Sequence, residues 1–367
     1  MNNVDKKTLL NINLDSINKN YKLIQKKIGK KCCIAATVKA NAYGLGADKI
    51  VPNLIKIGCK FFFVATTNEA IQLRKLNKKI NIFILNGLIT NELKLIHKHN
   101  LIPVINNLNQ LRKIESYQKI KRNNQKIALH FDTGMSRLGF DKSETKLLVK
   151  NKSKLIKKSK VFLIMSHLAC ADDKKSKLNK IQLIKFDSIR SHFPNCLHSL
   201  SNSAGVLLGK KYHFDMVRPG ISLYGGQCQK KEKLIYHEVV SLRAKLIQIR
   251  EIYKGDTIGY GATFKAGSKM IIGTLGFGYA DGFNRLFSNN FQIKLRNKTI
   301  KLVGRVSMDL ITVDLTDIKS KKNIMNEEFE IIGGKYSINT VAKIIDTIPY
   351  EILTNLGKRY ERRYISK

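Results

Sequence analysis

The sequence predicts an α/β protein: an N-terminal (βα)8 barrel of the TIM type followed by a C-terminal, mainly antiparallel β domain. Eight short, almost continuously apolar runs recur over the first 235 residues or so, which is typical of parallel strands buried on both faces. Amphipathic segments lie between most of these runs, as helices do in such a barrel. From about residue 236 the runs become shorter and several alternate with polar residues, which indicates antiparallel strands.

The apolar runs predict the barrel strands, and the segments between them predict the helices. The predicted strands are 34–38, 61–65, 82–85, 101–105, 127–131, 161–165, 197–200 and 214–217. The predicted helices are 15–28, 48–57, 68–76, 91–97, 108–120, 143–149 and 178–192. Asn68 and Asn91 stand near two of the helix starts, where asparagine is a good cap. The alternative, an open doubly wound sheet, requires a GxGxxG first turn, which the sequence lacks.

The barrel is predicted over residues 1–235 and the β domain over 236–367. The predicted strands of the β domain are 239–249, 270–275, 291–295, 299–303, 311–315 and 329–332, with a short helix at 338–345. Turns such as Lys254-Gly255-Asp256 separate them. The polar, lysine-rich stretch 229–233 is interpreted as the link between the two domains.

The chain is strongly basic, with 67 Lys and Arg against 27 Asp and Glu and a net charge of +40. Such a charge attracts phosphates, nucleic acid or anionic lipid. The basic residues are scattered, however, and the chain is equally rich in Ile and Asn, the composition that an AT-rich genome encodes. The charge is therefore interpreted mainly as codon bias, and no nucleic-acid partner is expected.

The cysteines and the N-terminus bear on the compartment. The six cysteines show neither CxxC pairing nor a spacing that suits zinc, so no metal is expected. The first 20 residues contain no apolar core of signal-peptide length, and no apolar run approaches the length of a membrane span. We expect a reduced, cytoplasmic protein that has no membrane partner.

Candidate functional residues stand where the predicted barrel strands end. In such barrels the active site gathers at the carboxyl ends of the strands, and phosphate groups favour the loops after strands seven and eight. The polar or glycine-bearing ends hold Lys39, Arg137, His167, Asn202, Ser203, Arg218, Gly220 and Ile221. A lysine held in an apolar wall loses hydration, which lowers its pKa and favours Schiff-base chemistry. The alternative for Lys39 is an ordinary surface lysine.

These residue types suit a ligand with a phosphate and an aromatic ring. Ser203 and the backbone amides around Gly220 and Ile221 can donate to phosphate oxygens. His167 can stack on or orient a ring, and Arg218 can donate to a ring nitrogen and keep it unprotonated. Taken singly, each has an ordinary alternative: a core histidine, a salt-bridged arginine or a serine helix cap. Their joint position at one end of a barrel favours the ligand site.

The string VKANAYGLG at residues 38–46 resembles the lysine motif of the alanine racemases, a family of pyridoxal-phosphate enzymes. Further motifs that resemble this family follow in family order over nearly the whole chain. In the barrel they are DTGMSRLGF (132–140), MSHLA (165–169), SNSAG (201–205) and MVRPGISLYG (216–225). In the β domain they are IGYGAT (258–263), GYADG (278–282), GRVSMD (304–309) and IPYE (348–351).

The resemblance implies pyridoxal 5'-phosphate as the cofactor and Lys39 as the residue that carries it. The residues expected at the cofactor are Lys39, Tyr43, His167, Asn202, Ser203, Arg218, Gly220, Ile221 and Tyr350. The resemblance also implies Tyr260 as the second catalytic base and Met308 as a substrate contact. Arg137 is the candidate for holding the substrate carboxylate. Without the resemblance, Tyr260 is interpreted as an aromatic residue that packs in a turn.

The chain departs from the family pattern at two positions. Many family members have a lysine, often carbamylated, two residues before the Asp of DTGM, where this chain has His130; Arg137 is then oriented by His130 or by a bound anion. Family members also often have a histidine three residues before the Asn of the strand-seven motif, as a partner for the arginine at the ring nitrogen. Here that position is Ser199, with His198 beside it.

The predicted activity is racemisation of alanine by two bases, Lys39 on the D-alanine face and Tyr260 on the L-alanine face, which supplies D-alanine for peptidoglycan. A phenol is a poor base at neutral pH, so a tyrosine in this role needs a cationic neighbour. The resemblance also implies a homodimer with shared active sites. The alternatives are a serine or lysine racemase or an amino-acid decarboxylase of the same architecture. A noncatalytic pyridoxal-phosphate-binding protein would lack the second domain.

Overall fold

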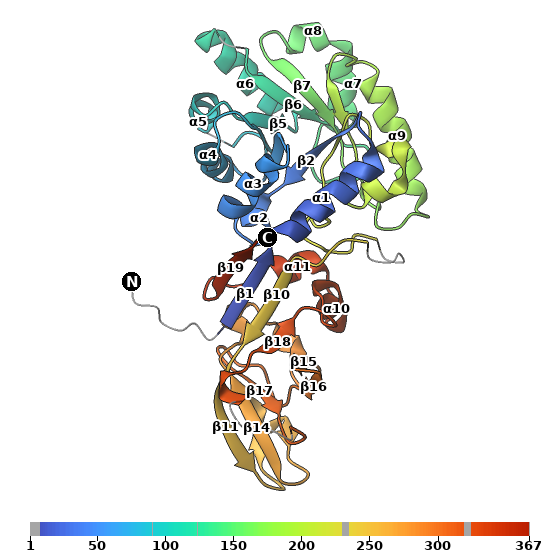
Figure 1. The fold of residues 1–367 in the computed structure, drawn as a ribbon. Helices are drawn as coiled ribbons and strands as arrows, with labels where there is room; N and C mark the ends of the chain where they lie inside the picture. The colour runs from blue at the N-terminus through green and yellow to red at the C-terminus, as the bar shows by residue number, and fades with distance from the viewer. Residues whose placement is uncertain (1–7, 90, 123, 230–234, 319–323, 367) are drawn as a thin grey trace. The chain divides into compact units, whose positions relative to one another are not determined.

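A computed structural model describes residues 8–89, 91–122, 124–229, 235–318 and 324–366 (Figure 1). The chain forms two compact units. The barrel unit holds Asn18–Leu223 and Gln227–Tyr236, and the β unit holds the chain up to Ile17, Tyr224–Gly226 and the chain from His237 onward. The sequence-based division at 235/236 differs from this at residues 8–17, which belong to the β unit. Of the stretch 229–233, only Gln229 is among the described residues.

The barrel unit contains one sheet of eight parallel strands, in the order β8-β7-β6-β5-β4-β3-β2-β9. The strands are β2 (Cys33–Thr37), β3 (Phe61–Val64), β4 (Asn81–Ile84), β5 (Ile102–Ile105), β6 (Lys126–His130), β7 (Lys160–Met165), β8 (Leu197–Ser199) and β9 (Met216–Val217). A parallel bridge between Asn202 and Arg218 joins the segments just beyond β8 and β9, so the ring of strands is nearly closed. The predicted (βα)8 barrel is confirmed.

Helices follow most strands and lie around the outside of the sheet (Figure 1). They are α2 (Lys39–Tyr43), α3 (Ala47–Lys56), α4 (Thr67–Leu76), α5 (Leu93–Lys98), α6 (Leu108–Lys121), α7 (Lys142–Lys150), α8 (Lys152–Leu155) and α9 (Lys177–Arg190), preceded by α1 (Leu14–Ile28). The predicted caps Asn68 and Asn91 are wrong. Thr66 caps α4 through a bond from the Glu69 N–H, and Glu92 occupies the cap position of α5.

The inside of the barrel is a packed apolar core. The rings of Phe63 and Phe83 stack with their centroids 4.4 Å apart, and both side chains are fully buried. Leu163, Met165 and Met216 belong to the same buried cluster. Because side chains fill the interior, ligands can reach this unit only at the ends of the strands.

The β unit contains a six-stranded mixed sheet of order β16-β15-β18-β10-β1-β19 and a three-stranded sheet of order β11-β14-β17. The strands are β1 (Thr8–Asn13), β10 (Val240–Ala244), β11 (Leu246–Ile252), β14 (Met270–Leu275), β15 (Gln292–Leu295), β16 (Lys298–Lys301), β17 (Ile311–Asp314), β18 (Phe329–Ile332) and β19 (Glu361–Ile365). A small hairpin adds β12 (Thr257–Ile258) and β13 (Phe264–Lys265), and the helices are α10 (Ile338–Ile344) and α11 (Pro349–Thr354). The predicted β domain is confirmed as mainly antiparallel.

Three features of the β unit differ from the sequence-based expectation. The run 239–249 is two strands, β10 and β11, which belong to different sheets. β1 pairs antiparallel with β10 and parallel with β19, so the two ends of the described chain are neighbours in one sheet. Neither β1 nor β19 was expected, because each is short and β19 is rich in charged residues.

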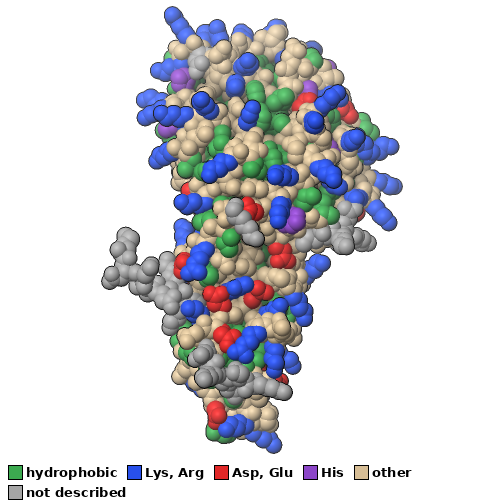
Figure 2. All heavy atoms as spheres, in the orientation of Figure 1, with side chains coloured by type: hydrophobic (Ala, Val, Ile, Leu, Met, Phe, Trp, Pro, Cys, Tyr) green, Lys and Arg blue, Asp and Glu red, His purple; other side chains and the backbone are tan. Residues whose placement is uncertain are grey.

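The basic side chains are spread over the visible face of the molecule in Figure 2, without one dense patch. This distribution agrees with the scattering of lysine along the sequence. Among the helices that the structure describes, none combines the length and the apolar character needed to cross a bilayer.

Candidate active site

Lys39 stands where β2 ends and is the first residue of α2. α2 is a single turn, and its residues Ala40, Asn41, Ala42 and Tyr43 all have φ between 51° and 58°, in the left-handed region. Burial lowers the pKa of the Lys39 ammonium, the positive charge of Arg137 lowers it further, and the carboxylate of Glu69 opposes both. The structure therefore favours the neutral, nucleophilic amine more than water does.

A group of hydroxyls and amides lies beyond β8 and β9. Ser203 Oγ accepts hydrogen bonds from the N–H of Gly220 at 2.9 Å and from the Ser222 N–H at 3.4 Å, and Ser222 Oγ lies 3.0 Å away. A Cβ on Gly220 would lie only 2.2 Å from Tyr43 Oη, so a side chain at this position would collide with the tyrosine hydroxyl. Asn202 Oδ1 closes the turn by accepting from the Gly205 N–H at 2.9 Å. These groups form a cradle of hydroxyls and backbone amides, the kinds of group that bind a phosphate.

Arg218 is buried, with 4% of its surface exposed. Its Nη1 donates to Ser199 Oγ, while Nη2 donates to the Ser166 carbonyl oxygen at 2.5 Å and lies 3.3 Å from His167 Nδ1. Because a guanidinium only donates, His167 Nδ1 is the acceptor and the proton of the neutral ring is on Nε2. Burial lowers the pKa of Arg218 to about 9, so it stays cationic at neutral pH. Burial, and then the charge of Arg218, hold the pKa of His167 well below its usual value.

Ser199 stands at the position where the family that the motifs resemble often has a histidine. Its hydroxyl donates to the Met216 carbonyl at 2.6 Å and accepts from Arg218. His198 is turned away: its Nδ1 lies 3.1 Å from an oxygen of Asp215 and its Nε2 lies 3.0 Å from the Phe193 carbonyl. Successive residues of a strand point to opposite faces, which explains why Ser199 contacts Arg218 and His198 does not.

His130 is held by Asn106 at the end of β6. His130 Nδ1 lies 2.8 Å from Asn106 Oδ1, and the Asn106 amide donates to the carbonyls of Leu85 and Val104. The amide orientation makes Oδ1 the acceptor, so His130 carries its proton on Nδ1. Burial, and then the charge of Arg218, lower the pKa of His130 to about 3. A neutral imidazole thus stands where many family members have a carbamylated, anionic lysine.

Replacing His130 with glutamine should reduce the decrease in the free energy of unfolding that occurs as the pH falls into mild acid. In the folded chain His130 stays neutral down to about pH 3, whereas in the unfolded chain it binds a proton below its ordinary value of 6.5. Stability therefore falls as the pH falls from 6.5 toward 3, by up to about 1.4 kcal/mol per pH unit. Between pH 7 and 5.5, urea unfolding should show a decrease in the free energy of unfolding that is about 1 kcal/mol smaller for His130→Gln than for the wild type.

The exposed His192 supplies the matched control for this comparison. His192→Gln makes the same substitution at an exposed position and shows how much of any change comes from replacing a histidine with a glutamine. Equal slopes for His130→Gln and the wild type would contradict a neutral, buried His130.

Arg137 lies on the exposed turn that follows β6. Asp132 Oδ1 organises this turn by accepting from the N–H groups of Gly134, Met135 and Ser136 at 2.9–3.1 Å. The charge of Arg137 contributes to lowering the pKa values of both Lys39 and His167, so Arg137 lies close enough to act on both groups. The nine barrel residues predicted for the site therefore all follow barrel strands at the same end.

Tyr260, Met308 and Tyr350 lie in the β unit. Tyr260 opens the 3-10 turn Tyr260–Ala262, and its side chain is 73% exposed; that of Met308 is 53% exposed. A Cβ on Gly261 would lie 2.8 Å from Arg305 Nη1, so the guanidinium of Arg305 packs against this turn. Tyr350 is half-buried in the first turn of α11. Large exposed side chains of this kind are common where another surface completes a site.

A clamp around Arg359 was missed in the sequence. Its Nε and Nη2 each donate at 2.8 Å to one oxygen of the buried Asp281 carboxylate, and Nη1 donates to Asp309 at 2.7 Å. The clamp ties the GYADG turn to the turn that carries Met308, and the Ala280 N–H donates to the Met308 carbonyl at 3.0 Å. The sequence did not indicate these ion pairs, because a run of charged residues such as the one around Arg359 is usually solvated. Glu69, also missed, had a signal: Thr66 and Glu69 form the T-x-x-E pattern of a capping box.

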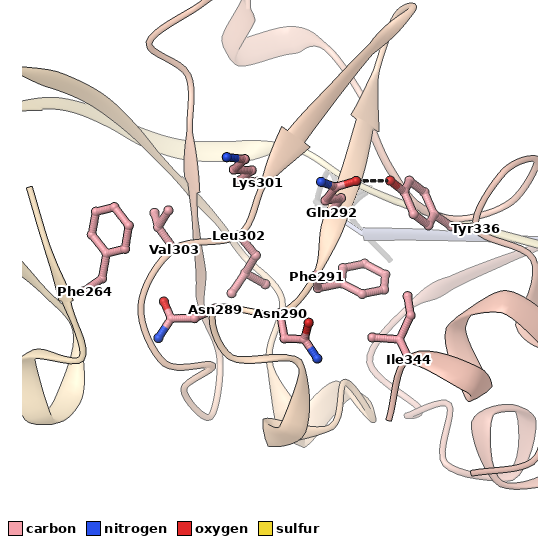
Figure 3. Close-up of a pocket in the computed structure, with 10 residues that line it drawn as sticks. All are labelled: Phe264, Asn289, Asn290, Phe291, Gln292, Lys301, Leu302, Val303, Tyr336 and Ile344. Carbon is pink, nitrogen blue, oxygen red and sulfur yellow. Dashed lines mark hydrogen bonds between the residues drawn. The ribbon is translucent and has the colours of Figure 1, made fainter. Parts of the chain in front are cut away.

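A cavity of about 410 Å³ lies in the β unit, lined by aromatic, amide and aliphatic side chains (Figure 3). Tyr336 donates to Gln292 Oε1 at 2.9 Å across it. Asn289, on its wall, donates to Thr263 Oγ1 at 3.2 Å and accepts from the Gly304 N–H at 2.6 Å. The cavity contains none of the predicted site residues, but its wall helps to fasten the Tyr260 turn.

Comparisons with known proteins identify the family of both units. The family model of the alanine racemase N-terminal domain matches residues 12–228, and that of the alanine racemase C-terminal domain matches residues 239–364. The alanine racemase of Rickettsia bellii is 42% identical over 337 residues, which cover 91% of this chain and 82% of that relative. The alanine racemase of Rickettsia rickettsii is 41% identical over 355 residues, covering 96% and 98% of the two chains.

Solved structures with the same fold include enzymes at substantial sequence identity. The alanine racemase of Bartonella henselae, which has covalently bound pyridoxal phosphate, superposes with a TM-score of 0.93 at 36% identity, covering 98% of this chain and 99% of that one. The biosynthetic alanine racemase of Pseudomonas aeruginosa superposes with a TM-score of 0.89 at 32% identity, covering 98% and 100%. With both family models matched and both units accounted for, the chain belongs to the alanine racemase family.

Proposed function

We infer that this chain catalyses the pyridoxal-phosphate-dependent interconversion of L-alanine and D-alanine. The observation that carries the proposal is the position of Lys39. Its ammonium has a lowered pKa and stands at the same barrel end as the Ser203–Gly220 cradle and the buried Arg218. A nucleophilic lysine, a phosphate cradle and a ring-nitrogen donor together suit this cofactor.

The cradle supports the fit of the cofactor's phosphate. Ser203, Tyr43 and the backbone around Gly220 and Ile221 bring hydroxyls and amides to one place, and the missing Cβ of Gly220 lets the Tyr43 hydroxyl approach this backbone closely. Asn202 orders the turn that carries Ser203. Tyr350 is proposed as a further contact of the phosphate. We propose that these residues hold the phosphate end of the cofactor.

Arg218 is proposed to contact the ring nitrogen. Its Nη1 is bound by Ser199 and its Nη2 by Ser166 and His167, which fixes the guanidinium at this end of the barrel. Bound pyridoxal phosphate withdraws electrons from the substrate's α-carbon and so makes its α-proton acidic. A guanidinium at the nitrogen keeps that nitrogen unprotonated and moderates this withdrawal, which suits proton transfer without side reactions. His167 is proposed to orient the ring.

Lys39 and Tyr260 are proposed as the two bases. Lys39, as a neutral amine, takes or returns the proton on the D-alanine face, and Tyr260 does so on the L-alanine face. The guanidinium of Arg305 packs against Gly261, the residue after Tyr260, and is proposed as the cationic neighbour of this tyrosine. Arg137 is proposed to hold the substrate carboxylate, and Met308 to contact the substrate.

We propose a cytoplasmic homodimer in which Tyr260 and Met308 of one chain complete the barrel site of the other. The high exposure of both side chains in the single chain supports this arrangement. The product D-alanine is proposed to supply peptidoglycan synthesis. In this division of labour, residues 1–235 bind the cofactor and residues 236–367 contribute the second base.

The activity is tested by incubating the purified chain and pyridoxal phosphate with L-alanine and following D-alanine by chiral chromatography. We expect the two isomers to approach equal amounts, from either starting isomer. L-serine and L-lysine, assayed in parallel, measure specificity. Release of carbon dioxide instead of D-alanine would indicate a decarboxylase, and the absence of any D-isomer would contradict the proposal.

Replacing Gly220 with alanine should weaken cofactor binding by about tenfold or more. The new Cβ would lie 2.2 Å from Tyr43 Oη and 2.8 Å from its Cζ, so the tyrosine or the turn must move. Dissociation constants from titration of the cofactor-free chain measure the change. Gly267→Ala is the control, because no atom lies within 4 Å of a Cβ there. An unchanged dissociation constant for Gly220→Ala would contradict the cradle.

A further inference from the structure

The turn that follows Lys39 is strained and must be held by its surroundings. Four successive residues with a Cβ, Ala40 to Tyr43, adopt left-handed φ values of 51–58°. L-residues disfavour this backbone, so it persists only where contacts over-determine it. Within the turn, the Ala42 N–H donates to the Val38 carbonyl at 2.9 Å and the Gly44 N–H to the Ala40 carbonyl at 2.8 Å.

Glu69 supplies a contact from outside the turn. This residue lies in the first turn of α4, and its Oε1 accepts from the Ala40 N–H at 2.6 Å. Its Oε2 accepts from the N–H groups of Ala65 at 2.8 Å and Thr66 at 3.2 Å. One carboxylate therefore connects the start of α4 to the residue directly after Lys39.

We propose that Glu69 is a positioning residue that holds the Lys39 turn in its left-handed conformation and so aims the Lys39 amine at the cofactor. This rests on the proposed function of Lys39. A capping box needs one carboxylate oxygen at its own helix start, and Oε2 meets that need at Thr66. Oε1 is left over from the cap and serves a different βα unit of the barrel.

The charge of Glu69 gives a second, independent test of the proposal, which is the pH at which Lys39 becomes a neutral amine. The charged groups that influence Lys39 are Arg137, which lowers its pKa after the larger effect of burial, and Glu69, which raises it. The imidazole of His167 is neutral and faces the same site. Removing the Glu69 charge therefore lowers the pKa of Lys39 further and moves the appearance of the neutral amine to lower pH.

Two variants separate the hydrogen bond from the charge. Glu69→Gln removes the charge and turns an amide N–H toward one of the backbone donors. Glu69→Asp keeps the charge, but its side chain is one methylene shorter and cannot reach both Ala40 and Ala65. Glu144→Gln is the matched control, since Glu144 lies in the first turn of α7 and its Oε1 accepts from the Leu108 N–H of another βα unit at 3.0 Å.

The measurements are the rate at which the cofactor-free full-length chain takes up pyridoxal phosphate between pH 6 and 10, and kcat for alanine. We expect Glu69→Gln to lower the maximal uptake rate and the maximal kcat by about tenfold to a hundredfold. The rise of the uptake rate with pH should also shift to lower pH. Glu69→Asp should lower both maximal values and leave the pH at which the uptake rate rises unchanged. Glu144→Gln should change neither.

Two results would overturn the proposal. The first is uptake and kcat within twofold of the wild type for both Glu69 variants. The second is an equal loss in Glu69→Gln and Glu144→Gln together with equal falls in melting temperature, because that indicates general loss of helix capping. A wild-type chain that takes up the cofactor but does not racemise alanine contradicts the proposed function and leaves the Glu69 effect on uptake measurable. A wild type that takes up no cofactor overturns both.

Discussion

Replacing Lys39 with alanine is expected to lower racemisation by about 10⁴-fold or more, because one side chain serves as cofactor anchor and as proton carrier. The fold should survive, since Lys39 is half-buried and burial of its ammonium carries a desolvation penalty that alanine removes. Initial rates of D-alanine formation, measured at saturating cofactor, quantify the loss. The melting temperature of the variant should match or exceed that of the wild type.

Chemical trapping locates the lysine independently of turnover. Borohydride reduction of the wild-type holoenzyme should attach the cofactor permanently to Lys39 and to no other lysine in peptide mapping. Lys49→Ala is the control, because Lys49 is exposed on α3. A small primary amine added to Lys39→Ala should restore part of the activity, which a misfolded site would not allow. Label on another lysine, or turnover by Lys39→Ala near the wild-type rate, would refute the role.

The barrel was predictable because its strands are buried on both faces. β7 is an example: the sequence predicts a strand over 161–165, and the structure has Lys160–Met165. A strand of this kind is apolar throughout whatever its partner is, so the local pattern is enough. β19 is the opposite case, since Glu361, Arg362 and Arg363 resemble a solvated segment. Its pairing with β1 joins residues at the two ends of the chain, which no local pattern reveals.

The site residues were predicted from motifs, but the contacts that orient them were not. Ser199 was identifiable in principle, because strand alternation puts it and His198 on opposite faces of β8. Asn106, Glu69 and Arg359 each act on a residue of another structural element, and the sequence does not specify which. The left-handed turn after Lys39 was also not predictable, because its residues have no glycine until Gly44.

Replacing Tyr260 with phenylalanine is expected to lower racemisation by about 10³-fold, while proton transfer by Lys39 on the D-alanine face should continue. Lys39 can still exchange the α-proton of D-alanine with deuterated solvent, whereas the α-proton of L-alanine has lost its base. Mass spectrometry of each isomer in D₂O should therefore show exchange of D-alanine only. Tyr253→Phe is the matched control, because Tyr253 is also exposed on the β unit. Equal loss of exchange from both isomers would contradict two bases on opposite faces.

A mixed dimer of Lys39→Ala and Tyr260→Phe chains tests whether the two bases come from different subunits. If sites are shared, one site of the mixed dimer contains neither base, while the other contains Lys39 from one chain and Tyr260 from its partner. The mixed dimer should then regain about half the wild-type activity per dimer, although each variant alone is nearly inactive. If both bases belonged to one chain, every site would lack one base and no activity would return. Differently tagged chains, purified in sequence after co-expression, make this comparison direct.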